Sequence, residues 1–466
     1  MTRRQKLRLI VQLSVPSILA QISATVMFFI DASMVGHLGE KATAAIGLVE
    51  STTWLLGGLG SAANMGFAVQ VAHFIGANDF EGARRVLRQA LVCCLGWSLM
   101  LSLLCLLVHS HLPFWLGGAA DIAGDASTYF MLIGLAGIFF QMEALAGSML
   151  KCSGNMKIPS VLNIMMCCLD VVFNYIFIYQ LDMGVKGAAM GTGLAELVTA
   201  LLMLYFLLWR SKILRLFRVP SVNPLQQGEA SAAGEMPPIA SARWWKPEGA
   251  TVLTAFKVGA PMGLQHLLMG GAQIVSTIIV APLGTVAIAA NSLAITVESL
   301  CYMPGYGIAE AATTLVGQSI GAGQRLLTRS LAHMSVALGI AVMTFMGVLM
   351  FVFAPQLMSV MSPVQQIVAE GTAALRIEAW AEPMFAASIV CNGVFIGAGD
   401  TLKPALMSLT SMWGVRLTLA WWLSQTHGLR GVWTAMAIEL TFRGAIFLAR
   451  LFHGGWNRKS LVKPHS

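Results

Sequence analysis

Long apolar segments follow one another along the whole chain, separated by short polar or Gly/Pro-containing breaks. Each has about 20 residues or more, which is enough for a helix to cross a bilayer. Because 57% of the residues are hydrophobic and only 11% are charged, the chain does not fit a soluble domain of ordinary composition. The sequence therefore predicts an all-α integral membrane protein with twelve transmembrane helices. We place them at residues 11–34, 43–74, 89–109, 125–150, 159–181, 187–209, 258–281, 287–320, 331–354, 369–396, 404–424 and 431–450.

The lysine and arginine residues are distributed unevenly between the predicted loops. If the amino terminus is cytoplasmic, most of the 29 basic residues fall on the cytoplasmic side, and only Lys41, Lys186 and Arg430 lie in outer loops. This bias predicts a multi-pass plasma (inner) membrane protein with both termini in the cytoplasm. The net charge of +8 then follows from the topology, and no nucleic-acid partner is expected.

The two halves of the chain repeat one another at a constant spacing. Landmark residues of the first half recur 245 residues later, and near the sixth span Gly184 and Gly428 match at a spacing of 244. The pairs at 245 are Pro16 and Pro261, Gly39 and Gly284, Gly76 and Gly321, Gly154 and Gly399, and Pro159 and Pro404. Because each half has six spans, both halves enter the membrane from the same side. The halves are therefore predicted to be parallel repeats, an arrangement known among transporters whose substrate sites lie between the repeats.

This repeat also divides the chain into three parts. Residues 1–210 are expected to form an amino-terminal six-helix lobe, and residues 256–466 a carboxy-terminal six-helix lobe with a cytoplasmic tail. The connector at 211–255 is rich in Pro, Gly, Ala, Ser and Gln, which is typical of a flexible linker, and we place it in the cytoplasm.

Several ionisable residues fall inside the predicted spans, where they are costly and are usually kept for ion or substrate handling. Asp31 lies near the outer end of the first span. Asp170 and Asn174 share one face of the fifth span, and Thr192 follows on the sixth at a similar depth. Their oxygens could bind a sodium ion, or one carboxyl group beside the other could carry a proton. The alternatives are that Asp31 only marks a helix end, and that the others are unrelated packing residues.

The second half has a different set of ionisable residues, since the position that matches Asp31 is Ser276. Glu378 and Glu382 are spaced to share a helix face, where they would repel each other unless one is protonated or a cation lies near, and Arg376 and Arg416 are the candidate partners. Glu310 follows the helix-bending Pro304 and could face a central cavity or have a structural role. We assign Glu310, Glu378, Glu382 and Arg416 to a substrate cavity.

The sequence offers no support for an enzyme. It contains no His-Glu-x-x-His or Gly-x-Ser-x-Gly motif, and its eight cysteines show no Cys-x-x-Cys or zinc-ligand spacing. No cofactor is expected apart from a coupling ion, which is H+ or Na+.

Three motifs resemble those of the multidrug and toxic compound extrusion (MATE) transporters, and the resemblance covers essentially all twelve spans. They are Asp31-x-x-Met-Val-Gly-His-Leu-Gly, the run Pro304-Gly-Tyr-Gly-Ile-Ala-Glu, and Gly397-Ala-Gly-Asp-Thr-x-x-Pro. The resemblance implies two six-helix lobes arranged as a V around a central cavity. It also implies a secondary active antiporter that exports organic, commonly cationic, compounds or drugs in exchange for H+ or Na+.

The resemblance also implies roles for individual residues. Asp31 falls on the first-span aspartate of the family. Related members complete a cation site with an Asn-x-x-x-Asp pair on the fifth span and a threonine on the sixth. Here Asp170 and Asn174 have the two residue types exchanged, while Thr192 fits. Some members use a seventh-span glutamate, and residues 258–281 contain none, so a sodium site in the second lobe is less expected.

Two further expectations complete this interpretation. The protein is expected to work as a monomer in the lipid bilayer. The alternative function within the same superfamily is a lipid-linked oligosaccharide flippase, which would need more basic residues in the central cavity than the in-span acids of this chain suggest.

Overall fold

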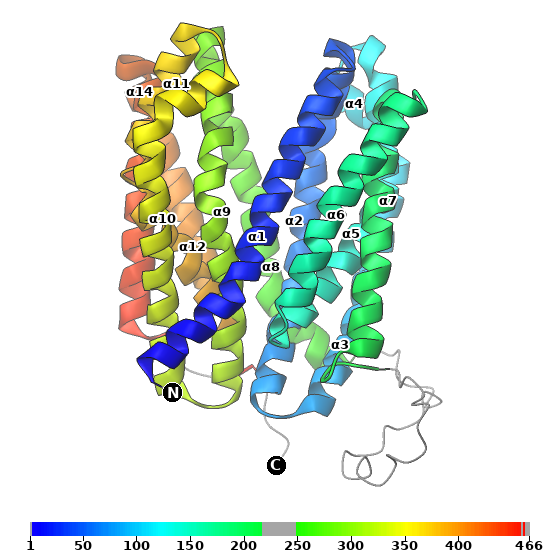
Figure 1. The fold of residues 1–466 in the computed structure, drawn as a ribbon, viewed down its shortest axis with the longest axis vertical. Helices are drawn as coiled ribbons and strands as arrows, with labels where there is room; N and C mark the ends of the chain where they lie inside the picture. The colour runs from blue at the N-terminus through cyan, green and yellow to red at the C-terminus, as the bar shows by residue number, and fades with distance from the viewer. Residues whose placement is uncertain (1, 217–247, 458–459, 462–466) are drawn as a thin grey trace.

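The computed structural model describes residues 2–216, 248–457 and 460–461, and the described residues form helices and no strand (Figure 1). The helices of the first half are α1 (Arg3–Gly36), α2 (Glu40–Gly76), α3 (Phe80–Val108), α4 (Leu112–Trp115), α5 (Ala120–Cys152), α6 (Lys157–Tyr175) and α7 (Gly184–Tyr205). Those of the second half are α8 (Gly249–Val280), α9 (Thr285–Gly321), α10 (Arg325–Met361), α11 (Gln365–Glu378), α12 (Glu382–Gly397), α13 (Leu402–Thr410) and α14 (Leu417–His453).

Ten of these helical stretches are long and apolar enough to cross a membrane, and α11 with α12 forms an eleventh span bent by 60°. The last stretch, Leu402–His453, has 52 residues and would be about 78 Å long if straight, against about 30 Å of hydrocarbon. Gly428 interrupts it with a non-helical backbone (φ 56°, ψ −136°), so this stretch supplies two spans. The described chain thus agrees with the twelve spans predicted from the sequence.

The repeat is visible in the backbone. Six of the nine described glycines with a positive φ form matched pairs at turns: Gly39 and Gly284 (φ 106° and 97°), Gly154 and Gly399 (88° and 74°), and Gly184 and Gly428 (54° and 56°). A positive φ is costly for residues with a side chain, which explains why glycine stands at these turns in both halves. The prediction of two parallel six-helix repeats is confirmed.

The two lobes converge at one end and diverge toward the other, as the V in Figure 1 shows. We call the end that contains Gly76 and Gly321 the closed end, and the end that contains Gly39 and Gly284 the open end. Glycine makes the contact at the closed end possible. A Cβ atom on Gly76 would lie 1.9 Å from the Gln318 carbonyl oxygen. The backbones of α2 and α9 therefore touch there.

Helix α1 crosses from one lobe to the other. Near the closed end Ile10 packs with Leu315 and Leu331 of α9 and α10, whereas near the open end Met34 packs with Ile178 of the first lobe. Figure 1 shows the corresponding slant of α1 across the front of the molecule. α8, its partner in the repeat, packs extensively against α2 of the first lobe. The first helix of each lobe therefore packs against the other lobe.

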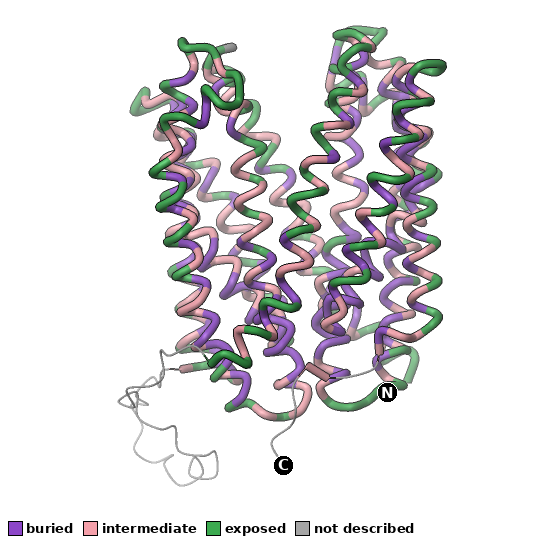
Figure 2. Tube along the Cα trace, turned by 180° about the vertical axis from the view of Figure 1, so that it is seen from behind, coloured by how far each residue is buried: buried purple, intermediate pink, exposed green. Residues whose placement is uncertain are grey.

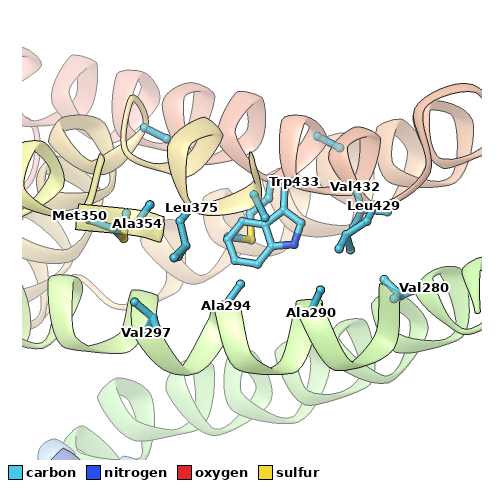
Figure 3. Packing of buried hydrophobic residues seen from close by; sticks show 14 of the residues in the cluster. Val280, Ala290, Ala294, Val297, Met350, Ala354, Leu375, Leu429, Val432 and Trp433 are labelled. Atoms are coloured by element: carbon cyan, nitrogen blue, oxygen red, sulfur yellow. The ribbon is translucent and has the colours of Figure 1, made fainter. Parts of the chain in front are cut away.

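Each lobe has its own apolar core. In the second lobe, Trp433 of α14 is buried among Ala294, Leu375 and Met436, and its indole nitrogen donates to Asn291 Oδ1 at 3.0 Å (Figure 3). Figure 2 shows buried segments concentrated inside each lobe and where the lobes meet at the closed end.

The outer faces are apolar. Helices α3 and α10, which are equivalent in the repeat, expose large side chains along one face: Leu99, Leu103, Leu107, Phe345, Val348 and Val352. A soluble protein rarely exposes such a row of large apolar side chains to water, whereas in a membrane protein the row contacts lipid tails.

The expected boundaries of the linker are only partly visible. Helix α8 begins at Gly249, before the expected lobe boundary at 256. Residues 211–216 follow the first lobe, and most of the expected linker at 211–255 lies outside the described residues, as does the end of the tail.

Candidate ion site and central cavity

The four residues predicted for ion coupling converge near the open end of the first lobe. The Asn174 amide nitrogen on α6 lies 3.1 Å from Asp31 Oδ1 on α1 and 3.2 Å from Asp170 Oδ2 on α6. It lies 3.5 Å from Thr192 Oγ1 on α7. Asp31 and Asp170 therefore both accept from the same amide group. Three helices thus bring two acids, an amide and a hydroxyl group to one point.

The spacing of Asp170 and Asn174 places both on one face of α6, and close packing of α7 holds them there. A Cβ atom on Gly191 would lie 2.1 Å from Asn174 Oδ1 and 2.9 Å from the Asn174 backbone nitrogen. Sequence reasoning missed Gly191 as part of the site. The signal was present, because Gly187 and Gly191 form a Gly-x-x-x-Gly pair, which lets membrane helices approach closely.

The electrostatics of this cluster are unbalanced. Asp170 and Asn174 are fully buried, while Asp31 is partly exposed. Among the described residues, no lysine or arginine forms an ion pair with either acid. Asp170 Oδ1 and Asn174 Oδ1 are buried and find no hydrogen-bond partner among the residues that the structure describes. A buried carboxylate beside a second, partly exposed one is strongly unfavourable without a cation, so the cluster is suited to take up a proton or a cation.

A second feature is a cavity of about 450 Å³ between the lobes. Residues of both lobes line it, among them Gln21 and Lys151 of the first lobe and Tyr306, Glu310 and Arg443 of the second. Glu310 therefore lies where the sequence analysis placed it. The span predicted from the sequence ends at residue 150, but α5 extends to Cys152 and carries the Lys151 side chain into the cavity.

The other three predicted cavity residues lie elsewhere. Glu378, Glu382 and Arg416 are not among the residues that line the cavity, and both glutamates are fully buried inside the second lobe. The prediction that the glutamates share a helix face is also wrong. Helix α11 ends at Glu378 and α12 begins at Glu382, with a 60° bend between them.

The buried acids of the second lobe are Glu298, Glu378, Glu382 and Glu439, and we call them the acidic cluster. Part of its charge is balanced within α14, where Arg443 Nε lies 3.1 Å from Glu439 Oε1. The four carboxyl oxygens of Glu378 and Glu382 have no hydrogen-bond partner within the described part of the chain.

Comparison with known proteins agrees with this architecture. The MatE family model matches residues 16–176 and 261–422, which is one match in each repeat. A probable multidrug resistance protein NorM of Thermotoga maritima is 24% identical over 460 residues, covering 97% of this chain and 94% of its own. The multidrug resistance protein PmpM of Pseudomonas aeruginosa is 25% identical over 468 residues, covering 96% of this chain and 91% of its own.

Solved structures share the fold. One is the outward-facing conformation of a multidrug resistance MATE family transporter of the MOP superfamily, with a TM-score of 0.86, 21% identity and 97% coverage of both chains. Another is a MOP superfamily transporter of Pyrococcus furiosus, described as having a binding pocket of reverse polarity, with a TM-score of 0.86, 20% identity, and coverage of 96% and 95%. The family match extends over most of both repeats. The chain belongs to the MATE family of multidrug efflux transporters.

Proposed function

We propose that the protein is a secondary antiporter that exports organic, commonly cationic, compounds in exchange for protons or sodium ions. The observation that carries the proposal is the pair of acids, Asp31 and Asp170, held together in one lobe without a basic partner among the described residues. The cavity between the lobes supplies a separate place for the substrate. We further propose that the protein works as a monomer in the plasma membrane.

The proposed orientation places the closed end in the cytoplasm. The amino terminus lies at this end in Figure 1, and the predicted loops on this side carry most of the lysine and arginine residues. Both termini are then cytoplasmic, and the described conformation is open toward the outside.

Helix α1 connects the ion site to the movement of the lobes. Asp31 lies on the part of α1 that packs against the first lobe, and Ile10 lies on the part that packs against the second. Pro16 between them removes a backbone hydrogen bond and allows the helix to bend. Neutralising the two acids changes how α1 packs on α6. An ion that binds more tightly to one of the two arrangements of the lobes, open outward or open inward, then shifts the equilibrium toward that arrangement.

The orientation of Asn174 favours protons as the coupling ion. Its amide nitrogen faces Asp31, Asp170 and Thr192, so the amide acts as a donor to the acids. A sodium ion at the same point would need oxygen ligands, and the Asn174 amide would have to turn over to supply one. A proton held between the two carboxyl groups needs no such change.

The test is efflux of a fluorescent organic cation from proteoliposomes with either a proton gradient or a sodium gradient imposed alone. We expect transport with the proton gradient. Transport with the sodium gradient alone would reject proton coupling and make the same oxygens a metal site. Absence of transport under both gradients would contradict antiport of cations.

A flippase remains the second candidate because Lys151 and Arg443 both line the cavity. A pyrophosphate-bearing lipid would need such basic groups. Each of them is already paired with a carboxylate, Glu310 and Glu439 respectively. This pairing makes cation export the better-supported function. Lipid that copurifies with a protein inactive under both gradients would favour the flippase.

Replacing Gly191 by valine is expected to uncouple transport. The new side chain would overlap the Asn174 amide and backbone, and overpacking of this kind costs about 1–3 kcal/mol. Asn174 must then move away from Asp31 and Asp170. We expect proton-driven efflux by the variant to fall by about tenfold or more, while the variant still inserts in the membrane. The neighbouring Met190→Val, at an exposed position, is the matched control. Equal efflux by the two variants would show that Gly191 does not position the site.

A further inference from the structure

An ion pair joins the two lobes at the floor of the cavity. Lys151 Nζ on α5 lies 2.9 Å from both carboxylate oxygens of Glu310 on α9. Gln21 Nε2 on α1 lies 3.3 Å from Glu310 Oε1. The Lys151 and Glu310 side chains are 19% and 29% exposed. The carboxylate of Glu310 is thus fully occupied by an ammonium group while it faces a space large enough for an organic molecule.

This ion pair belongs to a set of contacts that join the two lobes at the closed end. Next to it, Thr314 Oγ1 of α9 donates to the Lys151 carbonyl oxygen at 3.2 Å, and Gln318 Nε2 donates to the Cys152 carbonyl oxygen at 2.8 Å. All these bonds join the end of α5 in the first lobe to α9 in the second. When the lobes part at this end, the bonds break together and Lys151 moves away from Glu310.

We infer that Lys151 is a tethered competitor that displaces the transported cation from Glu310. This inference rests on the proposed function and names the place of the substrate charge. With the cytoplasmic end open, the Glu310 carboxylate is free and binds an organic cation. When that end closes, the Lys151 ammonium group takes both carboxylate oxygens, and the cation leaves toward the outside. The affinity of the cavity for cations therefore differs between the two states, which gives transport its direction.

The surroundings of Glu310 define the class of substrate. Tyr306 and Phe385 supply aromatic faces in the same cavity, and Met262 and Met269 supply adaptable thioether side chains. One free carboxylate beside aromatic and thioether side chains, in a lining that also holds uncharged polar groups such as Gln265 and Asn392, suits an organic cation with a single positive charge. A second positive charge on the substrate would meet the Arg443 guanidinium group in the same cavity, and the acid beside that group, Glu439, is already paired with it.

The test compares two variants whose effects on binding should have opposite signs. Ethidium, a fluorescent organic cation with one charge, is titrated onto the purified protein in nanodiscs. In Lys151→Met, Glu310 stays free when the closed end is shut, and we expect binding about tenfold to hundredfold tighter than in the wild type. In Glu310→Gln, we expect binding weaker by about the same factor. Lys157→Met, which changes an exposed lysine on the same side, is the control and should bind as the wild type does.

A purely structural ion pair predicts a different pattern. Loss of either partner would then weaken the closed end in the same way, and the two variants would change ethidium affinity alike. That result, or unchanged affinity in Lys151→Met, would overturn the inference. Lys151→Gln, which is neutral but keeps a hydrogen bond to Glu310, serves as a second variant if the methionine variant does not fold, and its affinity should also rise.

The same titration separates this inference from the proposed function. If the wild type neither binds ethidium nor transports it, cation export itself is contradicted. If the wild type transports ethidium and Lys151→Met does not bind it more tightly, only the role of Lys151 is contradicted.

Discussion

Replacing Asp31 by asparagine is expected to abolish ion-coupled efflux while the protein still folds and inserts. The amide has almost the same shape as the carboxyl group, but it can neither release a proton nor hold a negative charge. Asp170 then lacks the second acid that shares the Asn174 amide group with it and makes the site respond to an ion. We expect the efflux rate in proteoliposomes to fall by about 100-fold or more, the size typical of losing an essential proton-transfer group.

Two comparisons make this prediction specific. Asp125→Asn changes an exposed acid on α5 and should leave efflux near the wild-type rate. Ethidium binding to Asp31→Asn should be retained, because Glu310 lies in the cavity and outside the ion cluster. Near-normal efflux by Asp31→Asn would eliminate the proposed ion site, whatever the outcome at Glu310.

The ion cluster could be predicted from the sequence because local geometry defines most of it. Asp170 and Asn174 lie on one uninterrupted helix, so their spacing alone places them on one face. The depths of Asp31 and Thr192 follow from counting residues along their spans. The turn glycines revealed the repeat in the sequence, and the positive φ values of three matched pairs show it again in the backbone.

The cavity could not be predicted in the same way. Glu378 and Glu382 have the spacing of a shared helix face, but the chain bends by 60° between them. Glu310 and Lys151 are far apart in the sequence, and their contact depends on how the two lobes meet. Helix periodicity describes which residues share a face, but it does not say which face meets the other lobe.

Substitutions of two glycines at the closed end are expected to have the second large effect on efflux. Gly76 and Gly321, which are equivalent in the repeat, each lie against the backbone of the other lobe. A Cβ atom on Gly76 would lie 1.9 Å from the Gln318 carbonyl oxygen, and one on Gly321 would lie 2.0 Å from the His73 carbonyl oxygen. Neither acceptor is the end of a flexible side chain, so a substitution forces the helices apart. Gly76→Val and Gly321→Val are therefore each expected to hold the closed end open and to lower efflux by about tenfold or more.

The measurement that checks this is the distance between α2 and α9 at the closed end, from spin labels on exposed positions of the purified protein, together with efflux. Both valine variants should show a longer distance than the wild type. Gly96→Val is the matched control, because nothing lies within 4 Å of a Cβ atom at that position. Since separation of the closed end also withdraws Lys151 from Glu310, the two valine variants should bind ethidium more tightly than the wild type while exporting it more slowly. Loss of efflux with an unchanged distance would mean that these glycines serve folding rather than closure.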